Sequence, residues 1–148
     1  MTELNLGGNR VGAAGGVHLA RALGVNRSLK RLDLTDNHID IYSPEDEDCC
    51  VFIEALTTHA ARNGVFTYLD IFDNVIETRG GEAVVAMYEA RKESGAPTIN
   101  VRVSPRMRKE VYDTIAKGTK WVAGGGGGGK SGKKKASGKK KSGKKKKK

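Results

Sequence analysis

The sequence predicts an α/β repeat fold, in which units of one strand and one helix stack into a solenoid. The first observation is a pattern with apolar residues at its first, fourth, sixth and eleventh positions and asparagine at its ninth. This pattern occurs three times, at residues 1–11, 29–39 and 66–76. The second observation is that apolar residues recur at three- and four-residue spacing between these segments, which indicates helices. Internal repetition of this kind is typical of stacked units that share one core.

The repeated pattern resembles the leucine-rich repeat, as in Leu4, Leu6 and Asn9 of the first unit. The resemblance implies a curved parallel sheet with helices on its convex side and a concave face that usually binds other proteins. The 28-residue spacing of the first unit, and the residue types between its strands, resemble the ribonuclease-inhibitor-like subclass. That subclass includes Ran GTPase-activating proteins and the sensor domains of NOD-like receptors. The residues that carry this resemblance are Gly12, Gly15, Leu19, Ala22, Leu23 and Asn26.

The first unit begins with an alternating segment, Glu3–Leu6, that predicts a strand. A glycine-rich turn ends the strand, and an apolar stripe formed by Val17, Ala20 and Leu23 predicts the helix that follows. Gly24 and then Asn26 are the stop signals of this helix.

The second unit is longer because an acidic loop, Ile41–Cys50, precedes its helix. Ser43 suits the N-cap and Pro44 the first helical position, and the carboxylates that follow complement the positive end of the helix dipole. We expect the helix to run to about Arg62. Its predicted buried stripe consists of Val51, Phe52, Ala55, Leu56 and Ala60.

The third unit continues with a predicted helix at Arg79–Glu93, with Gly95 as its C-cap. A fourth, degenerate repeat follows. We align Ile99 and Val101 with the fourth and sixth positions of the pattern, which puts Ser104 where asparagine would stand.

A final amphipathic helix is predicted at Arg106–Lys117, with Met107, Val111 and Ile115 on its apolar side. Terminal repeats of a solenoid need a cap over the exposed end of their core, so we assign this role to the helix. Trp121 is interpreted as a further capping contact.

Asparagine at the ninth position has a physical reason to recur. Its side-chain amide can bond the backbone groups that are left unpaired where each strand turns away. We therefore predict that Asn9, Asn37 and Asn74 form a structural ladder and take no part in chemistry.

The chain divides into a repeat domain at residues 1–123 and a tail at residues 124–148 that contains only Gly, Lys, Ser and one Ala. Such a tail has no apolar surface to offset the entropy of ordering, and we expect it to be disordered. Twelve of the 27 basic residues are tail lysines, so the domain carries 15 basic against 17 acidic residues. The domain is either a small complete array or the C-terminal end of a longer one.

The candidate recognition surface is formed by strand residues that alternate with the core residues and point to the concave face. The expected rows begin at Glu3, Arg31, Tyr68 and Thr98. Exposed aromatics and arginines on a rigid strand are typical anchors of protein interfaces. The predicted partner-binding residues are Arg31, Asp33, Tyr68, Asp70, Phe72, Asn100 and Arg102.

No catalytic, metal or cofactor site is predicted. The histidines fall on different elements, and the adjacent Cys49 and Cys50 suit neither a disulfide within the fold nor a zinc site. Residues 124–131 match the expression for a phosphate-binding loop, but no strand or helix frames them. We therefore predict a protein that is not an enzyme and needs no cofactor.

The tail predicts electrostatic binding to a polyanion, such as nucleic acid or an acidic protein surface. The lysines assigned to this role are Lys133, Lys134, Lys135, Lys139, Lys140, Lys141, Lys144, Lys145, Lys146, Lys147 and Lys148. The sequence contains neither a transmembrane segment nor a secretory signal, so we expect an intracellular protein, cytoplasmic or nuclear.

Three functions fit these features. The first is an adaptor that binds a protein through its concave strands, with the tail as an electrostatic anchor. The second makes polyanion binding by the tail the main function. The third, from the subclass resemblance alone, is a GTPase activator.

Overall fold

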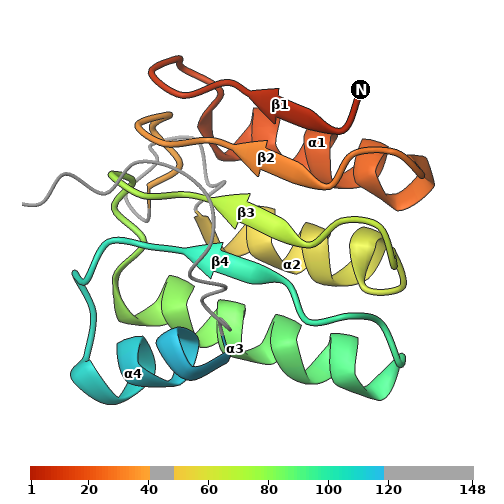
Figure 1. Cartoon of the computed structure of the whole chain (residues 1–148). Coiled ribbons are helices and arrows are strands. Elements are labelled where there is room, and N and C mark those ends of the chain that lie inside the picture. Colours follow the sequence, from red (N-terminus) through yellow and green to blue (C-terminus); the bar gives the residue numbers. More distant parts are fainter. Residues whose placement is uncertain (41–48, 119–148) are drawn as a thin grey trace, which may run out of the picture.

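The computed structural model describes residues 1–40 and 49–118 of the 148-residue chain. Its elements in chain order are β1 (Glu3–Asn5), α1 (Gly12–Val25), β2 (Arg31–Asp33), α2 (Cys49–Ala60), β3 (Tyr68–Asp70), α3 (Glu77–Glu93), β4 (Asn100–Arg102) and α4 (Lys109–Gly118). The strands form one parallel sheet in the order β1-β2-β3-β4, and the helices lie together on one side of it (Figure 1). This is the α/β solenoid that the repeats predict.

The core lies between the sheet and the helices. The fourth and sixth positions of the two central units, Leu32, Leu34, Leu69 and Ile71, are fully buried. The corresponding leucines of the first unit are only partly buried, because β1 pairs with a strand on one side only among the described residues.

The buried stripe of α2 differs from the prediction. Val51 and Ala55 are half-buried, whereas Ile53 is fully buried beside Phe52. The ring of Phe52 packs closely against α1 at Gly16, where a Cβ atom would lie only 2.8 Å from the ring. The absence of a side chain at Gly16 thus makes room for the Phe52 ring between the two helices.

The helix ends agree with the sequence to within about three residues. The predicted start at Ser43 and Pro44 lies outside the described residues, and α2 ends two residues before Arg62. The helix α3 begins two residues before the predicted Arg79 and ends at Glu93 as expected, with Gly95 in the left-handed region at φ 70°. The helix α4 begins at Lys109, later than the predicted Arg106.

The register of β4 corrects the predicted alignment by two residues. Val101 pairs with Leu69 and therefore occupies the fourth position, which had been assigned to Ile99. Because side chains alternate along a strand, a two-residue shift leaves the same set buried, namely Ile99, Val101 and Val103. Ser104 consequently stands at the seventh position and not at the ninth. The outward-facing row of the fourth unit begins at Asn100, so Thr98, its predicted first residue, lies before the row.

The helix α4 packs against α3 at the end of the stack (Figure 1). Ile115 is buried in the core, and Met107, Val111 and Tyr112 pack against it, as expected of a capping helix. Gly81 of α3 permits this contact, since a Cβ atom there would lie 2.7 Å from Met107 Sδ.

The predicted asparagines form a polar ladder beyond the carboxyl ends of the strands, here called the first ladder (Asn9, Asn37, Asn74). Asn74 accepts hydrogen bonds at Oδ1 from the backbone N–H groups of Asn37 and Ile39, both at 3.0 Å. Its Nδ2 donates to the carbonyl of Leu34 at 2.9 Å. Asn37 repeats this bridge to the first unit, accepting from the N–H of Val11 at 3.3 Å and donating to the carbonyl of Leu6 at 2.9 Å.

A second ladder, absent from the sequence predictions, lies at the opposite ends of the strands and consists of Asn26, Asn63 and Arg91. Asn63 donates to the carbonyls of Leu23 at 2.6 Å and Asn26 at 3.1 Å. One unit later, the guanidinium of Arg91 donates to the corresponding carbonyls, Ala60 at 2.8 Å and Asn63 at 3.0 Å. Arg91 is 2% exposed, and burial lowers its pKa.

Candidate functional site: the concave strand face

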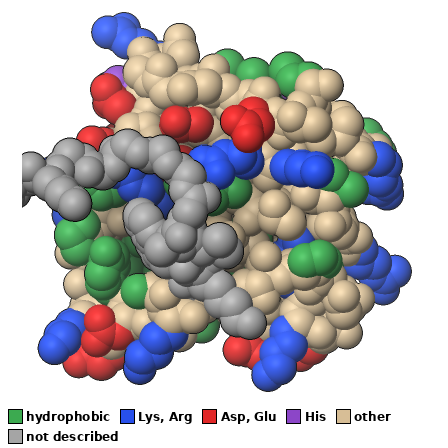
Figure 2. Space-filling model, viewed as in Figure 1, with side chains coloured by type: hydrophobic (Ala, Val, Ile, Leu, Met, Phe, Trp, Pro, Cys, Tyr) green, Lys and Arg blue, Asp and Glu red, His purple; other side chains and the backbone are tan. Residues whose placement is uncertain are grey.

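The strand register aligns the predicted site residues into columns across the sheet, on the face opposite the helices. The third positions are Glu3, Arg31, Tyr68 and Asn100, and the fifth positions are Asn5, Asp33, Asp70 and Arg102. Phe72 follows β3 at the seventh position. Figure 2 shows acidic and basic side chains interspersed over this face.

Arg31 and Tyr68 form the first stacked pair. The guanidinium carbon of Arg31 lies 4.0 Å from the centroid of the Tyr68 ring, within the range of a cation–π contact. Its Nε lies 3.8 Å from a carboxylate oxygen of Glu3 on β1. The Arg31 side chain is 50% exposed, so its charge remains accessible while its plane is held by the ring.

Arg102 and Phe72 form the second stacked pair, which is tied to Asp70. The guanidinium of Arg102 lies 4.2 Å from the Phe72 ring centroid and donates to Asp70 Oδ2 at 2.9 Å. Asp70 is 5% exposed and also accepts from the Tyr68 hydroxyl at 3.3 Å. This group of Arg31, Tyr68, Asp70, Phe72 and Arg102 is called the Asp70 cluster below.

The electrostatics of the Asp70 cluster raise the pKa values of Tyr68 and Arg102. Burial raises the pKa of the Tyr68 hydroxyl, the Asp70 carboxylate raises it further, and Arg31 acts in the opposite direction. The hydrogen bond to Asp70 raises the pKa of Arg102. Near neutral pH Tyr68 therefore presents a neutral phenol and Arg102 a charged guanidinium group.

The fifth position has a structural role that the sequence predictions missed. Its side-chain oxygen accepts a hydrogen bond from the backbone N–H of the seventh position: Asn5 from Gly7 at 2.8 Å, Asp33 from Thr35 at 2.9 Å, and Asp70 from Phe72 at 3.1 Å. Asn or Asp bonding the backbone two residues later is the signature of an Asx turn, and its repetition in three units was a detectable signal. Asp70 thus holds Phe72 as well as Arg102.

The structure brings together five of the predicted partner-binding residues, namely those of the Asp70 cluster. Asp33 lies on β2 beside Asp70, and Asn100 lies on β4 beside Tyr68, so both flank the Asp70 cluster. The predicted polyanion-binding lysines, the phosphate-loop match and Trp121 all lie outside the described residues.

Other reactive side chains do not assemble into a site within residues 1–40 and 49–118. Cys49 and Cys50 are both buried free thiols. His18, His38 and His59 are exposed and lie on α1, in the loop after β2 and on α2, respectively. In this part of the chain no group of three His, Cys, Asp or Glu side chains could hold a metal ion, and no helix is long and apolar enough to span a bilayer.

Comparison with protein families finds a similarity over three segments of the chain. A family model described as Leucine Rich repeat matches residues 1–20, 25–40 and 63–85, which include β1, β2 and β3. No curated protein matches the chain.

Proposed function

We propose that this chain is a non-enzymatic adaptor that binds a protein through its concave strand face. Its similarity to leucine-rich repeats, which generally mediate protein–protein interaction, supports this proposal. The observation that carries this proposal is the Asp70 cluster. Its two aromatic rings are each covered by a half-exposed arginine, and a nearly buried carboxylate bonds both Arg102 and Tyr68.

These residue types and their rigidity favour an interface. Tyrosine and arginine are enriched among the residues that dominate binding energy. Stacking fixes the guanidinium planes before a partner arrives, so less side-chain entropy is lost when contacts form. Asp70 is already paired, and the exposed hydrogen-bonding capacity is therefore on the arginines.

The test compares partners captured by the full chain and by variants of the cluster. Tyr68→Ala and Arg31→Glu should each reduce retention of a salt-resistant partner by tenfold or more, since loss of a hot-spot side chain costs roughly 2 kcal/mol. Val25→Ala is the control, because Val25 is 80% exposed on α1. Equal retention by the cluster variants and the control, with unchanged thermal unfolding, would overturn the proposal.

The tail supports a second, concurrent activity as an electrostatic anchor. Its twelve lysines carry no accompanying acidic residue within residues 124–148, and counterion release would drive their binding to nucleic acid or another polyanion. Removing residues 124–148 should abolish binding to a DNA duplex at low salt and leave the salt-resistant protein partner bound. If the protein partner were lost together with the tail, polyanion binding would be the main function.

The finer family assignment is part of the same proposal. The full helices α1, α2 and α3 between strands support a ribonuclease-inhibitor-like subclass. A GTPase activator is a hypothesis from that subclass alone, because no described residue specifically favours it. We propose the cytoplasm or the nucleus as the site of action.

A further inference from the structure

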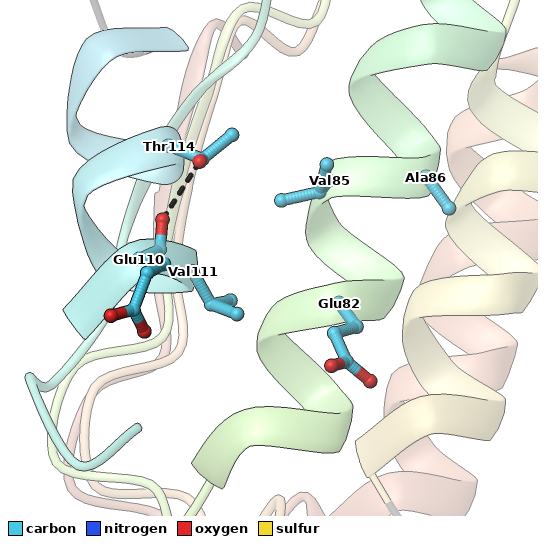
Figure 3. Close-up of a pocket in the computed structure, with 6 residues that line it drawn as sticks. All are labelled: Glu82, Val85, Ala86, Glu110, Val111 and Thr114. Carbon is cyan, nitrogen blue, oxygen red and sulfur yellow. Dashed lines mark hydrogen bonds between the residues drawn. The ribbon is translucent and has the colours of Figure 1, made fainter. Parts of the chain in front are cut away.

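A groove on the outer side of the helix layer separates α3 from α4 (Figure 3). Val85 and Ala86 of α3 and Val111 of α4 line it with apolar surface, and the carboxylates of Glu82 and Glu110 lie at one end. Its volume is about 390 Å³.

Two points of close contact between α3 and α4 involve glycines and flank the groove. At one point Gly81 meets Met107 and Val111, and at the other Gly118 meets the ring of Tyr88, where an added Cβ would lie 2.6 Å from a ring carbon. Between these points the short side chains of Val85 and Thr114 face the groove without filling it (Figure 3).

We propose that this groove is the docking site of the chain's own residues 119–123, Thr-Lys-Trp-Val-Ala. These residues follow α4 directly and contain the last large apolar side chains of the chain, Trp121 and Val122. Beyond them the tail offers only Gly, Lys, Ser and one Ala. Burying an indole and a valine side chain against Val85 and Val111 removes apolar surface of both partners from water.

The end of α4 delivers this segment to the groove. The contact between Gly118 and Tyr88 places the chain at the seam of the two helices when α4 ends. Thr114 lies four residues back along α4, about 6 Å. Trp121 is three residues past Gly118 and can reach about 10 Å, so one reversal at Gly118 brings the indole over Thr114 and Val85.

The charges are complementary. Arg108 already pairs with Glu82, whereas Glu110 is exposed at the groove. Lys120 is the basic residue of the docking segment, and Glu110 is within the turn of α4 that lies beside the groove. The carboxylate of Glu110 is therefore available to pair with Lys120 of the docked segment.

Docking at this groove would set where the basic tail leaves the domain. The tail would start on the helix side, opposite the strand face. If the strand face binds a protein as proposed above, the domain could hold that partner and a polyanion at the same time. The docking itself depends only on α3, α4 and residues 119–123.

The experiment uses the intrinsic fluorescence of the full chain, because Trp121 is its single tryptophan. The native emission should be blue-shifted relative to the chain in urea, and acrylamide should quench it severalfold less. Ala86→Lys, which places a cation beside Lys120 at an exposed position, should shift the emission to the red and restore quenching. Val85→Ser should have the same effect by removing an apolar wall.

The matched control is Ala22→Lys, an exposed alanine on α1, which should leave the emission unchanged. Circular dichroism shows whether each variant stays folded. A native emission equal to that of the unfolded chain, or a blue-shifted emission unaffected by both groove variants, would overturn the proposal. So would an emission that depends on protein concentration, because a second copy would then fill the groove. None of these outcomes bears on partner binding at the strand face.

Discussion

The two polar ladders solve the same problem at opposite ends of the strands, and they do so with different residues. The first ladder uses asparagine in each of the first three units, and each buried amide both accepts and donates. The second ladder uses Asn63 between the first two units. Between the next two units it uses the guanidinium of Arg91, which can donate hydrogen bonds but cannot accept them. In each unit the backbone carbonyls at the end of the helix need a hydrogen-bond donor, but the residue that provides this donor differs between units.

This difference follows from what surrounds each position. Asn63 also accepts at Oδ1 from the N–H groups of Val65 and Phe66, which shapes the turn into β3. The turn after α3 instead contains Gly95 in a left-handed conformation. With no side-chain amide there, a long side chain from the preceding helix reaches the carbonyls. A ladder is therefore better defined by the backbone groups it satisfies than by the residue type that satisfies them.

The largest expected effect is that of Arg91→Leu. It removes donors from the carbonyls of Ala60, Asn63, Phe66 and Pro97, all between 2.8 and 3.0 Å from the guanidinium. Leaving these buried acceptors unpaired should lower the free energy of unfolding by about 3–5 kcal/mol, measured by urea denaturation.

Arg106→Leu is the control for this prediction, because Arg106 is exposed. Its effect should stay within about 0.5 kcal/mol. Arg91→Lys should restore part of the loss, since an ammonium can donate to some of the same carbonyls. Equal stability of the Arg91→Leu and Arg106→Leu variants would mean that the second ladder adds nothing to the stack.

A comparison within the first ladder gives the next largest effect. Asn74 is 1% exposed and bridges two units, whereas Asn9 is exposed and donates only within its own turn, to the carbonyls of Leu6 and Gly7. Asn74→Ala should cost about 2–3 kcal/mol and Asn9→Ala under about 1 kcal/mol. The same urea titration checks both. Equal losses would show that the bridge between units has no energetic importance beyond the local turn.

The first ladder was predictable because its cause is local and repeated. The ninth asparagine follows an apolar strand in each of three units, and its bonding partners belong to the same turn and its neighbour. The second ladder was not predictable in this way. Arg91 lies within α3, where an arginine near the helix end has an ordinary explanation as a partner of the helix dipole.

The strand face shows the same limit of prediction from sequence. Which residues of β4 point outward follows from alternation, so Asn100 and Arg102 were placed on the correct face. Alternation is unchanged by a two-residue shift, and so the sequence could not place Arg102 beside Asp70 in the fifth column. The bond between Arg102 and Asp70, which joins the two halves of the cluster, required the structure.

The smallest effect tests how the first ladder ends. The ninth position of the fourth unit is Arg106 and not an asparagine, and the hydroxyl of Ser104 instead accepts a hydrogen bond from the backbone N–H of Asp73 at 2.8 Å. Asp73 is in the left-handed region at φ 57°, a conformation that such a bond helps to hold. Ser104 is 4% exposed, so Ser104→Ala removes a largely buried hydroxyl and its hydrogen bond and should cost about 1 kcal/mol in a urea titration. Ser28→Ala is the matched control, because its exposed hydroxyl makes only a long 3.4 Å bond to Asn26, and it should be neutral. A neutral Ser104→Ala would mean that the ladder ends at Asn74 and that Asp73 is held by its own unit alone.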